Sequence, residues 1–279
     1  MSLAPGVRRI LAGNAGLMTG PGTNTYLLGD REVAVLDPGP DDAHHLQCIL
    51  AAAGSSIRWI IVTHTHPDHS PLAAALARAT GARLIGLPPP DDGRQDATFR
   101  PDELPEDGRT LLLGDIALRA IHTPGHASNC LCYLLLDERL LFTGDHVLEG
   151  VSPVILPPDG DMGAYIDSLD KLESHPFDRI APGHGAVMQH GKSAVAQLRA
   201  HRMAREAKVL RCLAGGAANP GSGANRGGAT LDGLTAAVYD DVPVERHGWA
   251  RLTLEAHLIK LAREGRVSER AGIWRVVET

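Results

Sequence analysis

The sequence predicts an α/β fold followed by a small module of two helices and a β-hairpin. Short apolar runs typical of buried strands alternate with helical segments through most of the chain. Residues 214–228 are rich in Gly, Ala and Asn, the composition of a flexible linker, and helical periodicity resumes after them. We therefore expect one domain over residues 1–214 and a second over residues 229–279.

The composition narrows the class of protein. A hydrophobic share of 43% is enough for a sizeable core, and with aromatics at 4% that core is built mainly from aliphatic side chains. Residues 1–16 lack the continuous apolar segment of a signal peptide, and no run approaches the roughly 20 apolar residues of a membrane span. We expect a cytoplasmic protein whose four Cys are buried free thiols.

The first elements are predicted from periodicity and turn residues. Two strands between Asn24 and Leu36 form a hairpin around Gly29-Asp30, and a helix covers Asp42–Ala53, with His44 and His45 facing solvent. The β-branched run Ile57–Val62 is typical of a buried parallel strand. Ser70 is expected to cap the next helix, with Pro71 at its first position. The Pro- and Asp-rich stretch Leu87–Leu111 is expected to be a surface loop.

The later elements follow the same rules. Leu131–Leu136 and Leu140–Phe142 form a hairpin, Ser152–Asp161 is a Pro-rich loop, and helices cover Met162–Glu173 and about Lys192–Leu213. After the linker come helices at Leu231–Tyr239 and Arg246–Glu264 and a hairpin at Arg266–Val277 around Gly272. Two helices followed by a β-wing predict a winged-helix-like module.

Seven residues able to bind metal occur in this α/β part. His64, His66, Asp68 and His69 follow the strand Ile57–Val62 directly. Side chains two residues apart in an extended chain point the same way, so His64 and His66 can bind one ion, while the turn at Pro67 redirects Asp68 and His69 toward a second.

The other three candidates share one local plan. Each of His126, Asp145 and His184 follows a short hydrophobic strand and lies in a Gly-containing turn. A lone His is more often packed or solvated than a ligand, but three ligand types presented in the same way at strand ends favour a common site. The sequence therefore predicts a dinuclear metal centre.

The complete pattern His-X-His-X-Asp-His followed by His, Asp and His resembles the metallo-β-lactamase superfamily. The resemblance implies an αββα sandwich with two metals at one edge. It places His64, His66 and His126 on the first metal, Asp68, His69 and His184 on the second, and Asp145 between them. Asp37, at the end of the strand Glu32–Leu36, resembles the superfamily's Asp that hydrogen-bonds a ligand His; its alternative role is to cap the turn at Pro38-Gly39.

The same resemblance implies hydrolysis by a metal-bridging hydroxide. Two zinc ions suit imidazole and carboxylate ligands, and iron or manganese would accept the same set. Asp68 has a second, catalytic role in orienting the water and carrying its proton. Asp145 stands where the best-known β-lactamases have Cys, which disfavours lactam hydrolysis. His146 is either a substrate contact, a group behind the ligands, or simply a packed residue.

Along nearly its full length the chain resembles a narrower family, the lactamase-beta-like protein 2 group, which carries a C-terminal extension of this kind. The matching stretches are Pro182–Gly185, His201–Glu206 and His257–Val267. His146 replaces the Cys of the animal members, and Cys130 stands where relatives commonly have His. Both departures bear on substrate preference and leave the ligands intact.

The substrate remains open between several hypotheses. The net charge is −6, yet residues 191–279 carry an excess of Lys and Arg, and the family includes members that cut single-stranded RNA, so an endoribonuclease is the leading hypothesis. The alternatives are a small ester, thioester or lactone substrate, or a metal-binding regulator that acts through the C-terminal module. The resemblance also implies a homodimer. No membrane partner is expected.

Overall fold

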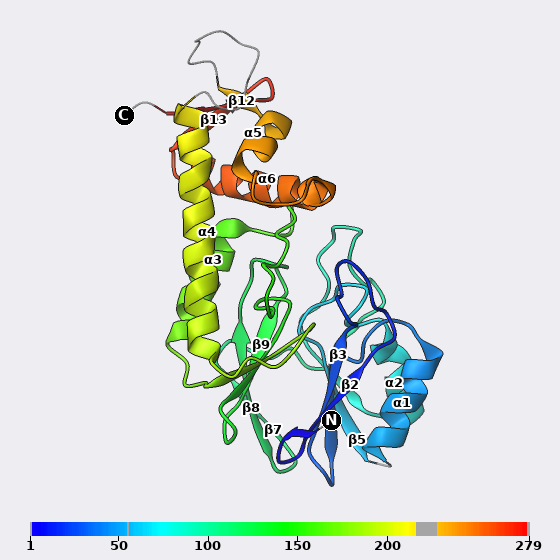
Figure 1. Ribbon diagram of the computed structural model, residues 1–279. Helices are drawn as coiled ribbons and strands as arrows, with labels where there is room; N and C mark the ends of the chain where they lie inside the picture. Colours follow the sequence, from blue (N-terminus) through cyan, green and yellow to red (C-terminus); the bar gives the residue numbers. More distant parts are fainter. Residues whose placement is uncertain (1, 55, 216–227, 278–279) are drawn as a thin grey trace.

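The computed structural model describes residues 2–54, 56–215 and 228–277, and it contains two sheets packed face to face between helices (Figure 1). In the first sheet, β4 to β6 are parallel and the others antiparallel. Its strands in order are β1 (Ser2–Ala4), β2 (Val7–Leu11), β3 (Asn24–Leu28), β4 (Val33–Leu36), β5 (Ile57–Ile61) and β6 (Arg83–Ile85).

The second sheet has the order β11-β10-β9-β8-β7, and only β10 and β11 run parallel. Its strands are β7 (Thr110–Leu113), β8 (Ile116–His122), β9 (Leu131–Leu135), β10 (Leu140–Gly144) and β11 (Arg179–Pro182). Side chains such as Tyr26, Leu118 and Phe142 fill the space between the two sheets, and the Tyr26 and Phe142 rings lie 4.9 Å apart. This apolar layer holds the two sheets against each other.

Helices cover the outer face of each sheet, which completes an αββα sandwich. Helices α1 (Ala43–Ala53) and α2 (Leu72–Thr80) pack on the first sheet through residues such as Ile49 and Leu76. Helices α3 (Met162–Glu173) and α4 (Gly191–Ala214) pack on the second through Leu169 and Val195. The predicted fold class is confirmed, and β5 is the parallel strand expected at Ile57–Val62.

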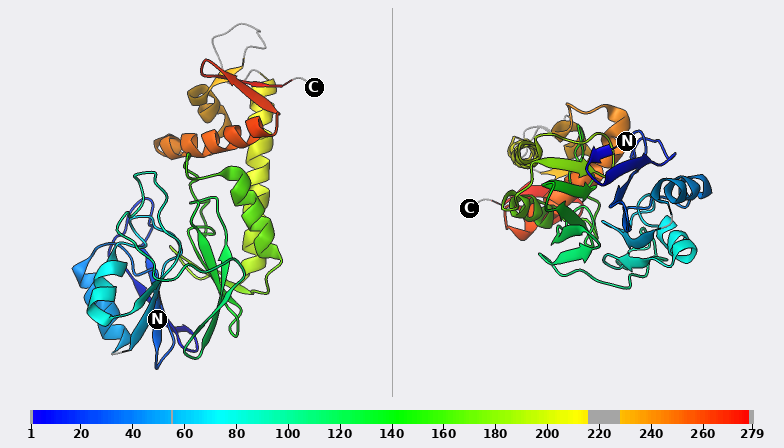
Figure 2. Two further views of the ribbon diagram at one scale, coloured as in Figure 1. Left: turned by 180° about the vertical axis from the view of Figure 1, so that it is seen from behind. Right: turned by 90° about the horizontal axis from the view of Figure 1, so that it is seen from below.

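The C-terminal module is a winged helix that sits on the upper half of α4 (Figures 1 and 2). Its elements are β12 (Ala229–Thr230), α5 (Leu231–Val238), the 3-10 helix η1 (Val244–Arg246), α6 (His247–Arg263), β13 (Val267–Arg270) and β14 (Ile273–Val276). Leu254 and Leu258 of α6 pack against Val209 and Leu213 of α4 in one apolar cluster. The predicted linker at 214–228 falls mostly on residues 216–227, which lie outside the described residues.

Two local predictions were wrong, and five strands were missed. Ser70 does not cap α2: Pro71 is at the N-cap position without a side-chain cap, and the Ser70 hydroxyl donates instead to Asp96. His45 is not solvated, because its ring is buried 2.8 Å from the Thr25 hydroxyl. The strands β1, β2, β6, β7 and β12 were not predicted; most are short edge strands with weak alternation. No helix within the described ranges is long and apolar enough to cross a bilayer.

Candidate metal centre

The seven predicted residues lie together where strands of both sheets end. The loop after β5 carries His64, His66, Asp68 and His69, and the turns after β8, β10 and β11 carry the other three. They form two groups in which the possible ligand atoms all lie within 4.8 Å of one another. The first group is His64, His66 and His126, and the second is Asp68, His69, Asp145 and His184. The structure thus brings all seven into one site.

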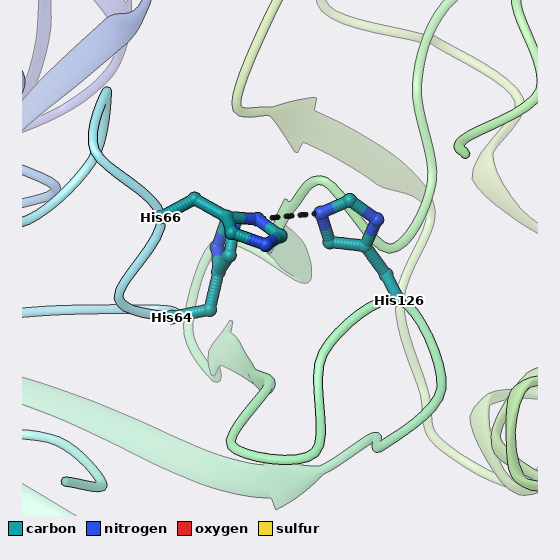
Figure 3. Close-up of side chains that lie close together, drawn as sticks. All are labelled: His64, His66 and His126. Carbon is teal, nitrogen blue, oxygen red and sulfur yellow. Dashed lines mark hydrogen bonds between the residues drawn. The ribbon is translucent and has the colours of Figure 1, made fainter. Parts of the chain in front are cut away.

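In the first group, three imidazoles face a common point (Figure 3). His126 Nε2 lies 3.0 Å from His66 Nδ1, and the ring centroids of His64 and His66 are 4.7 Å apart at an interplanar angle of 90°. Burial, followed by the charge of His126, lowers the pKa of His66 to about 3. Burial likewise holds the pKa of His64 well below its usual range. Both rings are therefore neutral at physiological pH, the form that coordinates metal.

In the second group, carboxylates alternate with imidazoles. His184 Nε2 is 3.0 Å from Asp68 Oδ2, and His69 Nε2 is 3.4 Å from the same oxygen. Burial disfavours a charged His184, but Asp145 and Asp68 outweigh this effect and raise its pKa to about 10. For Asp68, burial opposes ionisation, yet His69 and His184 hold its pKa below the usual range. The carboxylates of the second group therefore favour a positively charged partner.

Asp145 faces both groups. Its Oδ1 lies 3.3 Å from the Nε2 atoms of His69 and His184, and its Oδ2 lies 3.9 Å from His126 Nε2. The neighbouring turn after β11 packs tightly against it: a side chain added at Gly183 would meet Asp145 Oδ1 at 2.5 Å and His69 Cε1 at 2.7 Å. Gly183 is required here because only a bare backbone leaves room for these two side chains.

Four imidazoles are oriented by an acceptor on the side away from the site. His69 donates from Nδ1 to Asp37 at 3.0 Å, His126 to the Val154 carbonyl at 2.8 Å and His184 to the Gly22 carbonyl at 3.1 Å. His64 Nδ1 lies 3.1 Å from Thr63 Oγ1, a hydroxyl that itself donates to Asp37. With Nδ1 held in this way, each of these rings directs its Nε2 at the site.

These lone pairs converge on other acceptors, which is the arrangement that a cation requires. His64 Nε2, His69 Nε2 and Asp145 Oδ1 are buried and make no hydrogen bond of ordinary geometry with the residues that the structure describes. Buried acceptors that face one another without a proton or cation between them are costly. The donor set of imidazole and carboxylate, without thiolate, fits zinc, and it also fits iron or manganese.

Asp37 lies behind the ligands. Besides His69, it accepts hydrogen bonds from the backbone N–H of Thr63 at 2.7 Å and from the Thr63 hydroxyl at 2.8 Å. It thereby connects the end of β4 to the loop after β5. The sequence pointed to Asp37, but not to Thr63 or to the carbonyls of Gly22 and Val154, because backbone acceptors leave no signal in residue type.

The structure also places His146 and Cys130. The His146 side chain is fully buried, its ring lies 4.7 Å from the Tyr165 ring, and burial lowers its pKa to about 3. A ring with no exposed surface argues against a direct substrate contact and leaves a packed residue or a group behind the ligands. Cys130 is a free, buried thiol whose pKa is raised by burial, as expected, whereas Cys48 and Cys212 are free but only partly buried.

Comparisons with known proteins agree with this geometry. Residues 18–184 match the metallo-beta-lactamase superfamily, and residues 230–274 match the beta-lactamase associated winged helix domain. The chain is 33% identical to lactamase-like protein aptB of Emericella nidulans, over 95% of this chain and 84% of that protein. It is 32% identical to atrochrysone carboxyl ACP thioesterase of Aspergillus chevalieri, over 86% of this chain and 75% of that protein.

A solved structure agrees over almost the whole chain. A metallo-beta-lactamase family protein of Thermus thermophilus superposes with a TM-score of 0.80 at 23% identity, covering 99% of this chain and 100% of the other. At this identity the likeness shows the fold. Together with the matched family models, it means that the chain belongs to the metallo-beta-lactamase superfamily of hydrolases and carries the associated winged helix domain.

Proposed function

We propose that the two groups hold two metal ions and that the chain hydrolyses an acyl thioester. The convergence of Nε2 lone pairs and carboxylate oxygens carries the metal proposal. His64, His66 and His126 would hold one ion, Asp68, His69 and His184 the other, and Asp145 would reach both. Zinc is our proposed metal because every ligand is an imidazole or a carboxylate.

The thioester class is supported by the Aspergillus chevalieri relative, whose name describes a thioesterase, at 32% identity. In the reaction, water adds to the thioester carbonyl, a C–O bond forms and the C–S bond breaks. The products are a carboxylic acid and a free thiol, and the proton lost by the water is taken up by the leaving sulfur. When bound, the metal pair supplies a Lewis acid that polarises the carbonyl and acidifies the water.

The side chains of the site would orient the reactants. Asp68 is the most accessible of the carboxylates, with 25% of its side chain exposed, compared with 13% for Asp145 and 1% for Asp37. Its lowered pKa keeps it ionised, so it can accept a hydrogen bond from the attacking water and pass on its proton. Asp37 holds His69 in place from behind and does not face the substrate.

The charge distribution gives less support to the RNA hypothesis. Many cations of the basic C-terminal part are engaged in internal ion pairs: Arg199 with Asp170, Arg205 with Asp241, Lys208 with Asp240, Arg251 with Asp232, Lys260 with Glu206, Arg263 with Asp161 and Arg266 with Glu206. Paired cations offer little free positive charge to a phosphate backbone. The excess of Lys and Arg in the sequence therefore overstates the basic surface.

The test is turnover of acetyl-N-acetylcysteamine thioester in the presence of zinc. Turnover is measured as the rate at which free thiol is released. We expect the wild-type protein to release thiol, and His66→Ala and Asp145→Ala to fall to the rate of the uncatalysed solution. His44→Ala is the matched control, because this histidine is exposed on α1 and belongs to neither ligand group.

Two parallel assays decide between the alternatives. If the metal-loaded protein releases no thiol but cleaves bis(p-nitrophenyl) phosphate or labelled single-stranded RNA, the nuclease hypothesis replaces the thioesterase. If it hydrolyses none of the three, nor a simple ester or lactone, the regulator hypothesis replaces the thioesterase.

A further inference from the structure

A pocket leads from the metal centre to the C-terminal module. Its volume is about 360 Å³, within the range of roughly 300–1,000 Å³ that is usual for small-molecule sites. His126 and Asp145 form part of its lining on one side, and Trp249 and Ala250 of α6 line it on the other. In Figure 1, α6 runs across the end of the sandwich where the ligand loops lie. The module is thus a wall of the active site.

The walls of this pocket are mainly apolar. Leu148 and Val154 line it from the loops after β10, and Val242 and Trp249 line it from the module. Leu17, in the loop between β2 and β3, is 67% exposed at the pocket, and Trp249 is 39% exposed. Exposed large apolar side chains gathered around one opening mark a ligand site rather than ordinary surface.

Two of the three arginines that line the pocket are engaged by other protein groups, and the third, Arg246, is exposed. Arg202 donates to the Pro153 carbonyl and its guanidinium lies 5.2 Å from the centre of the Tyr165 ring. Arg205 lies 4.4 Å from the centre of the Tyr239 ring and is paired with Asp241. Engaged in this way, Arg202 and Arg205 have few donors left for an anion.

We propose that this pocket binds the acyl group of the thioester substrate, that the group is bulky, flat and apolar, and that Trp249 is the residue that selects it. The inference rests on the proposed thioesterase activity and names its substrate class. Because His126 and Asp145 line the pocket, an acyl group held against Trp249 has its carbonyl end directed at the metal centre. A flat aromatic acyl group gains most, since it can stack on the indole ring.

The experiment compares two thioesters of the same thiol, 2-naphthoyl- and acetyl-N-acetylcysteamine. We expect Trp249→Ala to lower kcat/KM for the naphthoyl substrate by roughly tenfold or more, mainly through KM, and to lower it much less for the acetyl substrate, whose methyl group makes little contact with the indole ring. Trp249→Phe should recover most of the loss, because it restores an aromatic ring. The matched control is Val244→Ala, which removes an exposed apolar side chain of η1 that does not line the pocket.

A binding measurement supplies a readout apart from turnover. Calorimetric titration with 2-naphthoate, the product acid, should give binding to the wild-type protein that Trp249→Ala weakens and Val244→Ala does not. If wild type and Trp249→Ala hydrolyse the naphthoyl substrate equally well, the acyl-pocket assignment is wrong while the thioesterase proposal stands. If neither thioester is hydrolysed, the thioesterase proposal itself fails. If Trp249→Ala slows both thioesters equally, Trp249 has a general structural role and does not select the acyl group.

Discussion

The imidazoles of the metal centre owe their orientation to residues that would not touch the metal. Asp37 is the clearest case, because one buried carboxylate accepts from the His69 ring, the Thr63 N–H and the Thr63 hydroxyl. Removing its charge leaves the His69 ring free to turn and takes away an acceptor that favours the neutral tautomer with its lone pair on Nε2.

We therefore predict that Asp37→Asn weakens metal binding by roughly 10- to 100-fold without unfolding the chain. The measurement is competition with a chelator of known affinity, followed by the metal content of the recovered protein. Asp115→Asn, a change of the same kind at another acidic position outside the ligand groups, serves as the control. Equal metal retention in the two variants would show that Asp37 acts only as a turn cap.

For individual residues, the sequence predicted the ligand side chains but not the backbone groups that orient them. The seven ligand candidates could be found because their residue types are chemically distinctive and each follows a strand. The carbonyls of Val154 and Gly22, which orient His126 and His184, belong to residues that carry no such signature. Only the folded chain brings them to the rings.

Among the elements, the contact between α4 and α6 depends on a buried ion cluster. Glu206 of α4 is buried and lies 2.8 Å from Lys260 of α6 and 3.2 Å from Arg266. Burial opposes its ionisation, but hydrogen bonds from His257 and Lys260 outweigh this effect and lower its pKa from 4.5 to about 2. The folded state therefore binds this proton more weakly than the unfolded state does.

The sign of the pH dependence follows from that shift. The stability contributed by Glu206 is fully present above its unfolded pKa of about 4.5 and is lost as the pH falls toward about 2. We predict that Glu206→Gln lowers the free energy of unfolding by roughly 1–3 kcal/mol at neutral pH, and that the difference from wild type shrinks near pH 3.5. Urea unfolding at both pH values measures it.

Glu245→Gln, at an exposed position on η1, is the matched control and should show neither effect. If the free energies of unfolding of Glu206→Gln and wild type differ by the same amount at both pH values, the ion cluster contributes to stability through packing and not through charge.

The elements themselves were predicted where strong periodicity or turn chemistry marks them, as in α3, α4 and the two helices of the module. In the structure, Asp42 and Asp161 cap α1 and α3 by accepting from the backbone N–H groups of His45 and Ala164. The predicted cap at Ser70 was wrong because the Ser70 hydroxyl donates to Asp96, in a loop distant in the sequence. Edge strands such as β1 and β12 depend on pairing with other strands, which local patterns do not reveal.

At the scale of the whole molecule, α4 is shared by both parts of the chain. Its first half packs on the second sheet through Val195 and Leu198, and its second half packs in the module through Val209 and Leu213. Ala256 of α6 also reaches the core beneath the second sheet. We propose domains at 1–214 and 229–279, as the composition of the linker predicts, but their cores are in contact.

A chain that ends at residue 214 should therefore be less stable than the full chain. It exposes Val209 and Leu213, which are buried in the complete protein, and it opens the pocket at Trp249. We expect thermal unfolding to give a lower Tm, and we expect the shortened chain to bind a hydrophobic dye more strongly. An unchanged Tm would mean that the winged helix is an independent appendage.

The sequence alone could not show that the module faces the active site. Its basic composition favoured a role in binding nucleic acid, whereas the structure shows several of its cations paired and some of its apolar side chains lining the pocket. Composition records how many charges a segment has, but not which of them remain free after folding.

The central claim is that strand-end turns from both sheets assemble a site for two metal ions. It is tested most directly by the metal content of protein purified with zinc and freed of loosely bound metal. We expect two ions per chain in the wild type and a clear loss in Asp145→Ala, because Asp145 faces both groups. Trace metal in the wild type, or the same content in both proteins, would contradict the claim.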